Sequence, residues 1–253
     1  MTEDRDAKIS AYWEDPKTSS MNDRYVATLE TEMISRHILP EERVLDLGCG
    51  DGTGSQGYRA SHTGGYIAME RAWKMLGEFT KREPGLALLR GDLRALPFSR
   101  APEHLFPVVI TQRALINLPD ETAQEAVLNS LPGLVMPGGK LLLCEAFREG
   151  AENINILREH LGYPAIPARW HNVHLTHALT QRVLGDRMEL TAEEDLSMYF
   201  FLTRVVNQAL SGNVPLDWDR PFNKVAFDIA RSGLGPVFRG WSHITLQVWK
   251  KPG

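Results

Sequence analysis

Glycines stand at alternate positions after a short apolar run, beginning with Gly48, Gly50 and Gly52. Glycines this close together let the chain turn tightly and let a ligand approach bare backbone. Their spacing differs from the Gly-x-Gly-x-x-Gly of dinucleotide-binding proteins, and no Lys-Ser or Lys-Thr pair follows to bind a nucleoside triphosphate. Asp46 precedes the first glycine, and its charge would repel a phosphate but attract an ammonium group. The turn therefore predicts a ligand that carries a positive charge.

Two more acidic residues end the next two apolar runs. Glu70 lies roughly 20 residues beyond the turn, where an acidic side chain can accept both hydroxyls of a ribose. Asp92 can accept the exocyclic amine of adenine, while Leu93 offers its backbone amide. Three carboxylates without a phosphate clamp predict an unphosphorylated adenosine joined to an amino acid.

Short apolar runs alternate with longer segments of helical character between residues 43 and 147. This alternation predicts crossover units and a parallel sheet covered on both faces, which is a doubly wound α/β domain. Ligands of such sheets lie beyond the carboxyl ends of the strands. The expected strands are residues 44–47, 66–69, 86–89, 108–110 and 141–143.

The rest of the chain surrounds this core, which we place at residues 41–150. Residues 1–40 predict one or two helices, and residues 151–220 predict an insertion of helices and loops that covers the sheet. Residues 221–253 are expected to supply the final strands, because apolar residues alternate between Trp241 and Trp249. Within the core, we also expect a helix over 119–135, followed by a sharp turn at 137–139.

Over roughly residues 40–147 the sequence resembles the class I S-adenosylmethionine-dependent methyltransferases. Four pieces carry the resemblance, in the expected order and spacing: Asp46 to Gly54, Glu70, Gly91 to Phe98, and Leu134 to Leu141. The resemblance implies S-adenosylmethionine as cofactor and a Rossmann-like, seven-stranded sheet. It also implies that the turn holds the methionine moiety, Glu70 the ribose, and Asp92 with Leu93 the adenine. The expected cofactor contacts are Trp13, Arg24, Asp46, Gly48, Cys49, Gly50, Gly52, Glu70, Arg71, Asp92, Leu93, Gln112 and Arg113.

The N-terminal helices are expected to form a lid over the cofactor. Tyr12 and Trp13 would exclude water, and Arg24 would bind the methionine carboxylate, as such segments often do in the family. Packing of ordinary surface helices is the competing interpretation.

Arg113 and Asn117 follow the fourth expected strand, where many family members carry an apolar residue and a histidine. Four residues apart, they would share one face of a helical turn beside the methyl-transfer site. The alternative is structural: Arg113 pairs with a nearby acid and Asn117 caps the turn. The segment also resembles a subgroup with Arg-x-Leu-Ile-Asn-Leu, Trp-His-Asn and a Tyr-containing helix, which implies that the acceptor pocket is lined by Arg113, Asn117, His171, Asn172, Tyr199 and Arg204.

His171, His174 and His177 recur every three residues, which suggests a metal site. No Asp or Glu stands at ligand spacing beside them, so we expect no metal. The two cysteines, Cys49 and Cys144, supply neither a disulfide framework nor a paired metal motif, a pattern typical of the cytosol.

A net charge of −4 argues against a nucleic-acid partner, and no segment has the length and hydropathy of a signal peptide or a membrane span. We therefore expect a cytoplasmic methyltransferase that acts on an oxygen of a small molecule or modified peptide, either a carboxylate or a hydroxyl. Arg113, Asn117 and His171 would orient the acceptor, and an ionised carboxylate would need no base. The alternatives are an N-methyltransferase of a small-molecule amine, with His171 as base, and a non-catalytic protein that binds S-adenosylmethionine.

Overall fold

The computed structural model describes residues 2–15, 17–18, 22–60, 62–212, 217–232 and 238–253. In these residues seven strands form one sheet, in the order β3-β2-β1-β4-β5-β7-β6. The first five are parallel, β7 is antiparallel to β5, and β6 is antiparallel to β7. The prediction of a doubly wound seven-stranded sheet is confirmed. The strands are β1 (Val44–Leu47), β2 (Tyr66–Glu70), β3 (Ala87–Arg90), β4 (Phe106–Gln112), β5 (Val135–Ala146), β6 (Glu189–Asp195) and β7 (Ile244–Lys250).

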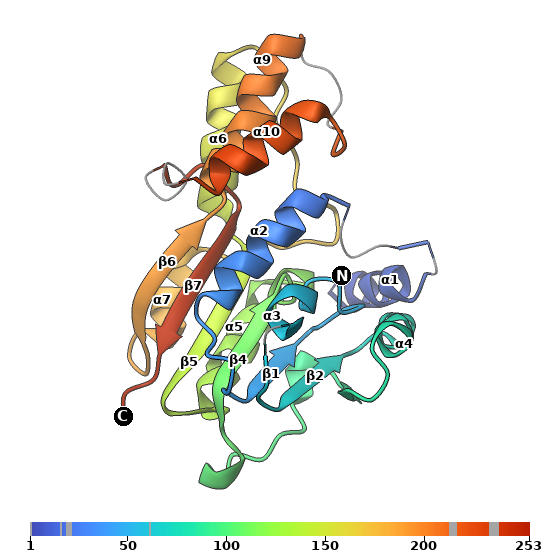
Figure 1. Cartoon of the computed structure of the whole chain (residues 1–253), viewed down its shortest axis with the longest axis vertical. Helices are drawn as coiled ribbons and strands as arrows, with labels where there is room; N and C mark the ends of the chain where they lie inside the picture. The colour runs from blue at the N-terminus through green and yellow to red at the C-terminus, as the bar shows by residue number, and fades with distance from the viewer. Residues whose placement is uncertain (1, 16, 19–21, 61, 213–216, 233–237) are drawn as a thin grey trace.

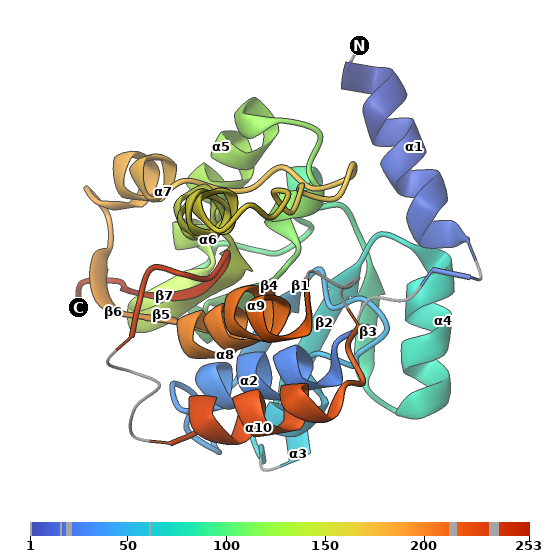
Figure 2. The same ribbon diagram turned by 90° about the horizontal axis from the view of Figure 1, so that it is seen from above.

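Helices cover both faces of this sheet and its upper edge. Figure 2 shows α2 and α10 on one side and α5 and α7 on the other. Figure 1 shows α6, α9 and α10 rising above the carboxyl ends of the parallel strands, with α1 beside α4. The helices are α1 (Thr2–Glu14), α2 (Arg24–Ser35), α3 (Gln56–Ala60), α4 (Trp73–Arg82), α5 (Glu121–Ser130), α6 (Arg148–His160), α7 (His177–Leu184), α8 (Ser197–Phe201), α9 (Asn207–Ser211) and α10 (Pro221–Ala230), with a π-helical turn at Leu202–Val206 between α8 and α9.

The core consists of two apolar layers, one on each face of the sheet. Alternate residues of a strand point to opposite faces. Val44 therefore packs with α2, α8 and α10, whereas its neighbour Leu45 packs with α5 and α7. Two covered faces explain why the central strands β1 and β4 are buried along most of their length.

β1 lies between β2 and β4, so the chain leaves it towards one edge of the sheet and returns on its other side. The loops after β1 and β4 separate at this point and leave a crevice beyond the carboxyl ends of the strands. The glycine turn follows β1, and Arg113 follows β4. The topology thus brings together the two segments that the sequence analysis assigned to cofactor and acceptor.

The C-terminal half differs from the expected division at 151–220 and 221–253. Strand β6 lies inside the first range, where only helices and loops were expected, and helix α10 opens the second, where strands were expected. β6 lies at the edge of the sheet, where it pairs with β7, and its residues 189–191 are exposed. Its sequence therefore lacks the alternation of apolar and polar residues that predicts a half-buried strand. Backbone pairing, which leaves no trace in side-chain pattern, holds it at the sheet edge.

Two boundaries inside the core also differ from expectation. Helix α5 ends at Ser130 and a 3-10 turn follows over Leu131–Gly133, because Pro132 cannot continue an α-helix. β5 begins at Val135 and includes the glycines that were expected to form a turn before it; its pairing with β4 is irregular there, and Gly138 has φ of 76°. Within the described ranges, no helix is both long and apolar enough to cross a membrane.

Candidate functional site

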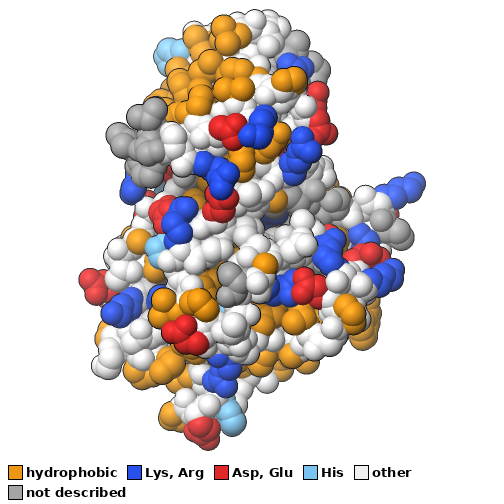
Figure 3. All heavy atoms as spheres, viewed as in Figure 1, with side chains coloured by type: hydrophobic (Ala, Val, Ile, Leu, Met, Phe, Trp, Pro, Cys, Tyr) orange, Lys and Arg blue, Asp and Glu red, His pale blue; other side chains and the backbone are white. Residues whose placement is uncertain are grey.

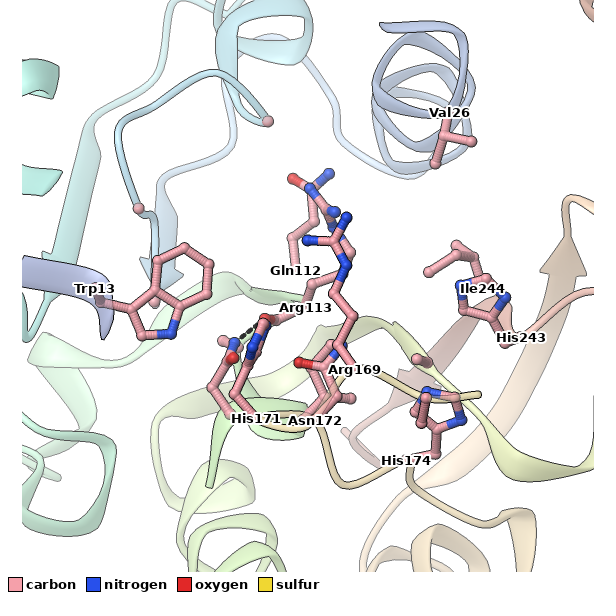
Figure 4. A pocket seen from close by; sticks show the side chains of 18 of the residues that line it. Trp13, Val26, Gln112, Arg113, Arg169, His171, Asn172, His174, His243 and Ile244 are labelled. Atoms are coloured by element: carbon pink, nitrogen blue, oxygen red, sulfur yellow. Dashed lines mark hydrogen bonds between the residues drawn. The ribbon is translucent and has the colours of Figure 1, made fainter. Parts of the chain in front are cut away.

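A cavity of about 410 Å³ opens beyond the carboxyl ends of β1, β2 and β4. Its roof is the helical cap, by which we mean α6, residues 161–176 and α8 to α10. Figure 4 shows Trp13 at one side of the cavity and His174 with His243 at the other. The residues of the sequence prediction that line it are Trp13, Asp46, Gly48, Cys49, Gly50, Glu70, Arg71, Asp92, Leu93, Gln112, Arg113, Asn117, His171, Asn172 and Arg204.

The turn after β1 forms the floor of the cavity. Gly48 has φ of 80°, a conformation that side chains rarely adopt, and a Cβ added there would lie 2.4 Å from the Cβ of Ala114. The backbone amides of Gly48 and Cys49 both donate to the carbonyl of Met69 at the end of β2. A ligand resting on this turn therefore meets rigid backbone rather than side chains.

Asp46 is a buried acid with one unused oxygen. The hydroxyls of Tyr58 and Tyr66 both donate to Oδ2, while the buried Oδ1 has no hydrogen-bond partner among the described residues. Burial raises the pKa of this carboxyl, because a charge is costly away from water. An ammonium group in the cavity would satisfy Oδ1 and offset that cost, so Asp46 fits the amino end of S-adenosylmethionine.

Glu70, at the end of β2, accepts three backbone hydrogen bonds, from Gly50 at 3.1 Å, Arg71 at 2.7 Å and Ala72 at 2.9 Å. A carboxylate has about four acceptor positions. One position is therefore left for a ligand hydroxyl, whereas the sequence analysis expected Glu70 to accept from two. Burial raises the pKa of Glu70, and its backbone partners offset part of that shift.

Asp92 lies in a network of ion pairs that reaches the N-terminal helix. Arg94 donates to both oxygens of Asp92, and Arg71 lies 3.6 Å from one of them. Asp6 of α1 in turn contacts Arg71 at 2.9 Å and Arg94 at 3.1 Å. Burial would raise the pKa of Asp92, but the hydrogen bonds and charge of Arg94, together with the charge of Arg71, lower it. Helix α1 is thereby tied to the acid expected to bind adenine.

Arg113 follows β4 with φ of 50°, the only positive value among the described residues other than glycine. Its Nε lies 3.3 Å from Oε2 of Glu30, a fully buried acid on α2 that also accepts from Gln112 at 2.8 Å. Burial raises the pKa of Glu30, and the charge of Arg113 offsets part of this shift. Asn117 donates to the Arg113 carbonyl at 2.7 Å, which leaves its buried Oδ1 without a partner among the described residues. The backbone strain and the buried acid hold Arg113 in one position.

Helix α1 covers His171 with aromatic rings. The imidazole stacks on Tyr12 with a centroid distance of 4.5 Å, and Trp13 and Trp170 contact it edge to face. Burial, helped by the charges of Arg169 and Arg5, lowers the pKa of His171 to about 4. The ring is therefore neutral at physiological pH, and its buried Nδ1 has no partner in the described part of the chain.

Three predicted site residues do not line the cavity. Gly52 has φ of 77° and packs against the ring of Phe79. Arg24 lies on the surface with 69% of its side chain exposed, near Asp219 and Tyr25. Tyr199 is fully buried behind the cavity wall, where its hydroxyl donates to Asp23. In the structure these three residues lie outside the cavity. Gly52 and Tyr199 are packed against other residues, and Arg24 is exposed at the surface.

The sequence analysis did not include several lining residues of the cap in the site, among them Arg169, His174, Phe200, Trp218 and His243. Arg169 directly precedes the Trp-His-Asn segment and Phe200 follows Tyr199, but neither was assigned to the site, and Trp218 and His243 belong to no motif. His174 was part of the histidine series. The rings of His174 and His243 lie nearly parallel, with centroids 5.7 Å apart.

The histidine series separates in the structure. Among the described residues, no three His, Cys, Asp or Glu side chains gather as a metal site requires. His177 instead lies between Glu149 at 3.1 Å and Glu193 at 3.2 Å. The hydrogen bonds that His177 donates to Glu193 and Glu149 raise its pKa to about 9, against the effect of burial.

Comparison with known proteins agrees with a methyltransferase fold. Residues 44–139 match a family model described as a methyltransferase domain. Over 107 residues the chain is 30% identical to a demethylmenaquinone methyltransferase from Renibacterium salmoninarum. That alignment covers 42% of this chain, and the chain spans only 42% of the relative's length.

Solved structures are similar over nearly the whole chain. A methyltransferase chain from a Haloferax volcanii complex with the Trm112 activator has a TM-score of 0.63 at 18% identity, covering 97% of this chain and 98% of that one. A geranyl diphosphate C-methyltransferase from Streptomyces coelicolor has a TM-score of 0.59 at 12% identity, covering 98% of each chain. The magnesium protoporphyrin IX methyltransferase of Synechocystis has a TM-score of 0.55 at 14% identity, covering 98% of this chain and 94% of that one. At these identities the similarity establishes the fold.

Proposed function

We propose that this chain, whose residues 44–139 match a methyltransferase domain, is a class I S-adenosylmethionine-dependent methyltransferase that transfers a methyl group to an oxygen of a small-molecule or peptide acceptor. One observation carries the proposal. A single cavity has the glycine turn and the acids Asp46, Glu70 and Asp92 at one end, and Arg113, Asn117 and His171 at the other. The first group suits the methyl donor and the second suits an acceptor.

The chain's own residues bind the donor in this proposal. The unpartnered Oδ1 of Asp46 accepts from the ammonium group, Glu70 accepts from the ribose, and Asp92 with the amide of Leu93 binds the adenine edge. S-adenosylmethionine supplies a methyl carbon that bonds to the acceptor lone pair while the carbon–sulfur bond breaks and its electron pair stays on sulfur. Helix α1 closes the donor end through Trp13, and so excludes water.

The cap supports an acceptor that needs no base. A neutral His171 stacked on Tyr12, with a pKa near 4, is a weak base at physiological pH. An ionised carboxylate carries a free lone pair already, so positioning by Arg113 and Asn117 supplies the acceleration. The similar folds serve different acceptors, as the names of the two neighbours with stated substrates show. The proposal that the methylated atom is an oxygen therefore rests on His171, Arg113 and Asn117, not on the fold.

One face of the molecule also favours a small acceptor over a nucleic acid. On the face drawn in Figure 3, basic and acidic side chains are interspersed and form no continuous basic area. A nucleic-acid partner engaged through its phosphates would need such an area.

Transfer of isotope-labelled methyl to matched acids, alcohols and amines tests the proposal. We expect labelled product with a methyl–oxygen bond, together with S-adenosylhomocysteine. Product with a methyl–nitrogen bond would support the amine alternative, and donor binding without any turnover would support the non-catalytic one.

Substitution of His171 by alanine tests whether a base is needed. With an ionised carboxylate acceptor we expect His171→Ala to lower kcat by less than about tenfold, since only orientation is lost; removal of a general base costs about 100-fold or more. S-adenosylhomocysteine affinity, measured by calorimetry, is the control for the integrity of the donor end. A loss of 100-fold with unchanged affinity would assign His171 as the base.

A further inference from the structure

Arg169 is an unpaired cation that lines the cavity from the cap. It belongs to the exposed segment between α6 and α7, and Figure 4 shows its side chain between Arg113 and His174. Its guanidinium makes no hydrogen bond, ion pair or ring contact with the described part of the chain. By contrast, Arg113 is paired with Glu30, and Arg204 with Asp23 at 3.4 Å. Arg169 thus has all five of its donors available.

The acids of the cavity do not neutralise this charge. Asp46, Asp51, Glu70 and Asp92 lie at the donor end. Asp23 is the one acidic lining residue described at the cap end. It already accepts from the amides of Tyr25 and Val26, from the Tyr199 hydroxyl and from Arg204. The cap end therefore carries one uncompensated positive charge.

The two histidines beside Arg169 add hydrogen-bonding capacity without charge. Burial lowers the pKa of His174, and burial together with His174 and nearby arginines lowers the pKa of His243 to about 3. A neutral imidazole offers one donor and one acceptor. Among the described residues that line this end of the cavity, Arg169 thus carries the one charge without a partner, and Arg148 behind the lining adds positive charge near His174.

The walls around these polar groups are apolar. They consist of Val26, Ile116, Ile154, Phe200, Trp218 and Ile244. Such a surface favours a ligand with hydrocarbon or an aromatic ring, because burial removes apolar area from water. One free cation inside an apolar wall matches a ligand with one negative charge and an apolar body, whereas a phosphate dianion would need a second cation.

We propose that the acceptor is a carboxylic acid with an apolar body, whose carboxylate pairs with Arg169. The pairing rests on the proposed function, because the same cavity must also hold the methyl donor. A guanidinium and a carboxylate can form two parallel hydrogen bonds, which fixes the orientation of the acid as well as its charge. Arg169 is then the residue that selects acids over the corresponding alcohols and amines.

Titration of 4-phenylbutanoate, 4-phenylbutanol and 4-phenylbutylamine, monitored by ligand-observed NMR, tests this selection. Each probe is titrated into the whole protein with and without saturating S-adenosylhomocysteine. We expect the acid to bind about tenfold more tightly than the alcohol, as a charge-assisted hydrogen bond predicts. Arg169→Gln should reduce that ratio to about one, and Arg169→Lys should keep part of it.

Arg182→Gln is the matched control, because Arg182 lies on α7 and pairs with Glu125 on the far side of α5. Its acid-to-alcohol ratio should equal that of the wild type. Equal binding of acid and alcohol, failure of all three probes to bind, or an unchanged ratio in Arg169→Gln would overturn the proposal. Failure of S-adenosylhomocysteine to bind would contradict the proposed function instead, since the ratio is also measured without it.

Discussion

At the scale of single residues, the donor end of the cavity could be predicted from sequence and most of the acceptor end could not. Asp46, Glu70 and Asp92 each follow a strand, so local pattern and topology place them together. Arg169 and His243 are 74 positions apart, and only the folded cap brings them to one cavity. Arg24 does not line the cavity, since a basic residue near an expected lid says nothing about which way its side chain points.

Gly48 gives a prediction at this scale. Gly48→Ala should lower the free energy of unfolding by about 1–3 kcal/mol, because its φ is positive and its new Cβ would meet that of Ala114. Gly85→Ala is the matched control, since Gly85 has φ of 94° but open space around its Cβ position. We expect the control to lose only the smaller backbone term and to keep its S-adenosylhomocysteine affinity. Chemical denaturation and calorimetry measure both, and equal losses in the two variants would contradict a close approach at Gly48.

At the scale of elements, the five parallel strands could be predicted from their apolar runs, whereas β6 could not. Helix α1 was expected, but its attachment was not. Helix α4 lacks a capping side chain at Ala72, and Glu14 from the end of α1 accepts from the amides of Trp73 at 2.8 Å and Lys74 at 3.0 Å instead. A side chain that caps the N-terminus of a helix from a distant part of the chain has no local sequence signature.

The capping of the α4 N-terminus by Glu14 predicts a coupling between α1 and α4. Glu14→Ala should cost about 0.5–2 kcal/mol, as loss of an N-cap does, and should release α1 from α4. Hydrogen–deuterium exchange should then rise in both helices. Asp4→Ala is the control, because Asp4 contacts only Lys8 of its own helix on the exposed surface. Unchanged exchange in α1 of Glu14→Ala would show that the contact does not hold the helix.

The junction of α7 with β6 and α6 predicts a pH dependence. The pKa of His177 is raised from 6.5 to about 9 in the folded protein by Glu193 and Glu149. Its stabilising contribution is therefore complete below about pH 6.5 and is lost as the pH rises through about 9. The melting temperature of His177→Gln should fall below that of the wild type at pH 6.5, and the two should converge by pH 9.5. A difference that stays constant over this range would argue against a charged His177.

At the scale of the whole molecule, the division of the cavity explains how one fold combines a constant donor with varied acceptors. The donor end is built from loops of the parallel sheet, whose positions follow from the strand order. The acceptor end combines the loop after β4, which carries Arg113 and Asn117, with the helical cap, which the sheet does not specify. This division also explains why residues 40–147 resemble a methyltransferase domain while the acceptor has no comparable sequence signature.

The central claim is that the cavity binds S-adenosylmethionine through its acids. Isothermal titration calorimetry of the wild-type protein and of Asp46→Asn tests it most directly. We predict one site per chain for S-adenosylmethionine and for S-adenosylhomocysteine, with about tenfold or weaker binding in Asp46→Asn, because the amide loses its charge-assisted bond to the ammonium group. Absence of binding heat and of thermal stabilisation with both ligands in the wild-type protein would contradict the account.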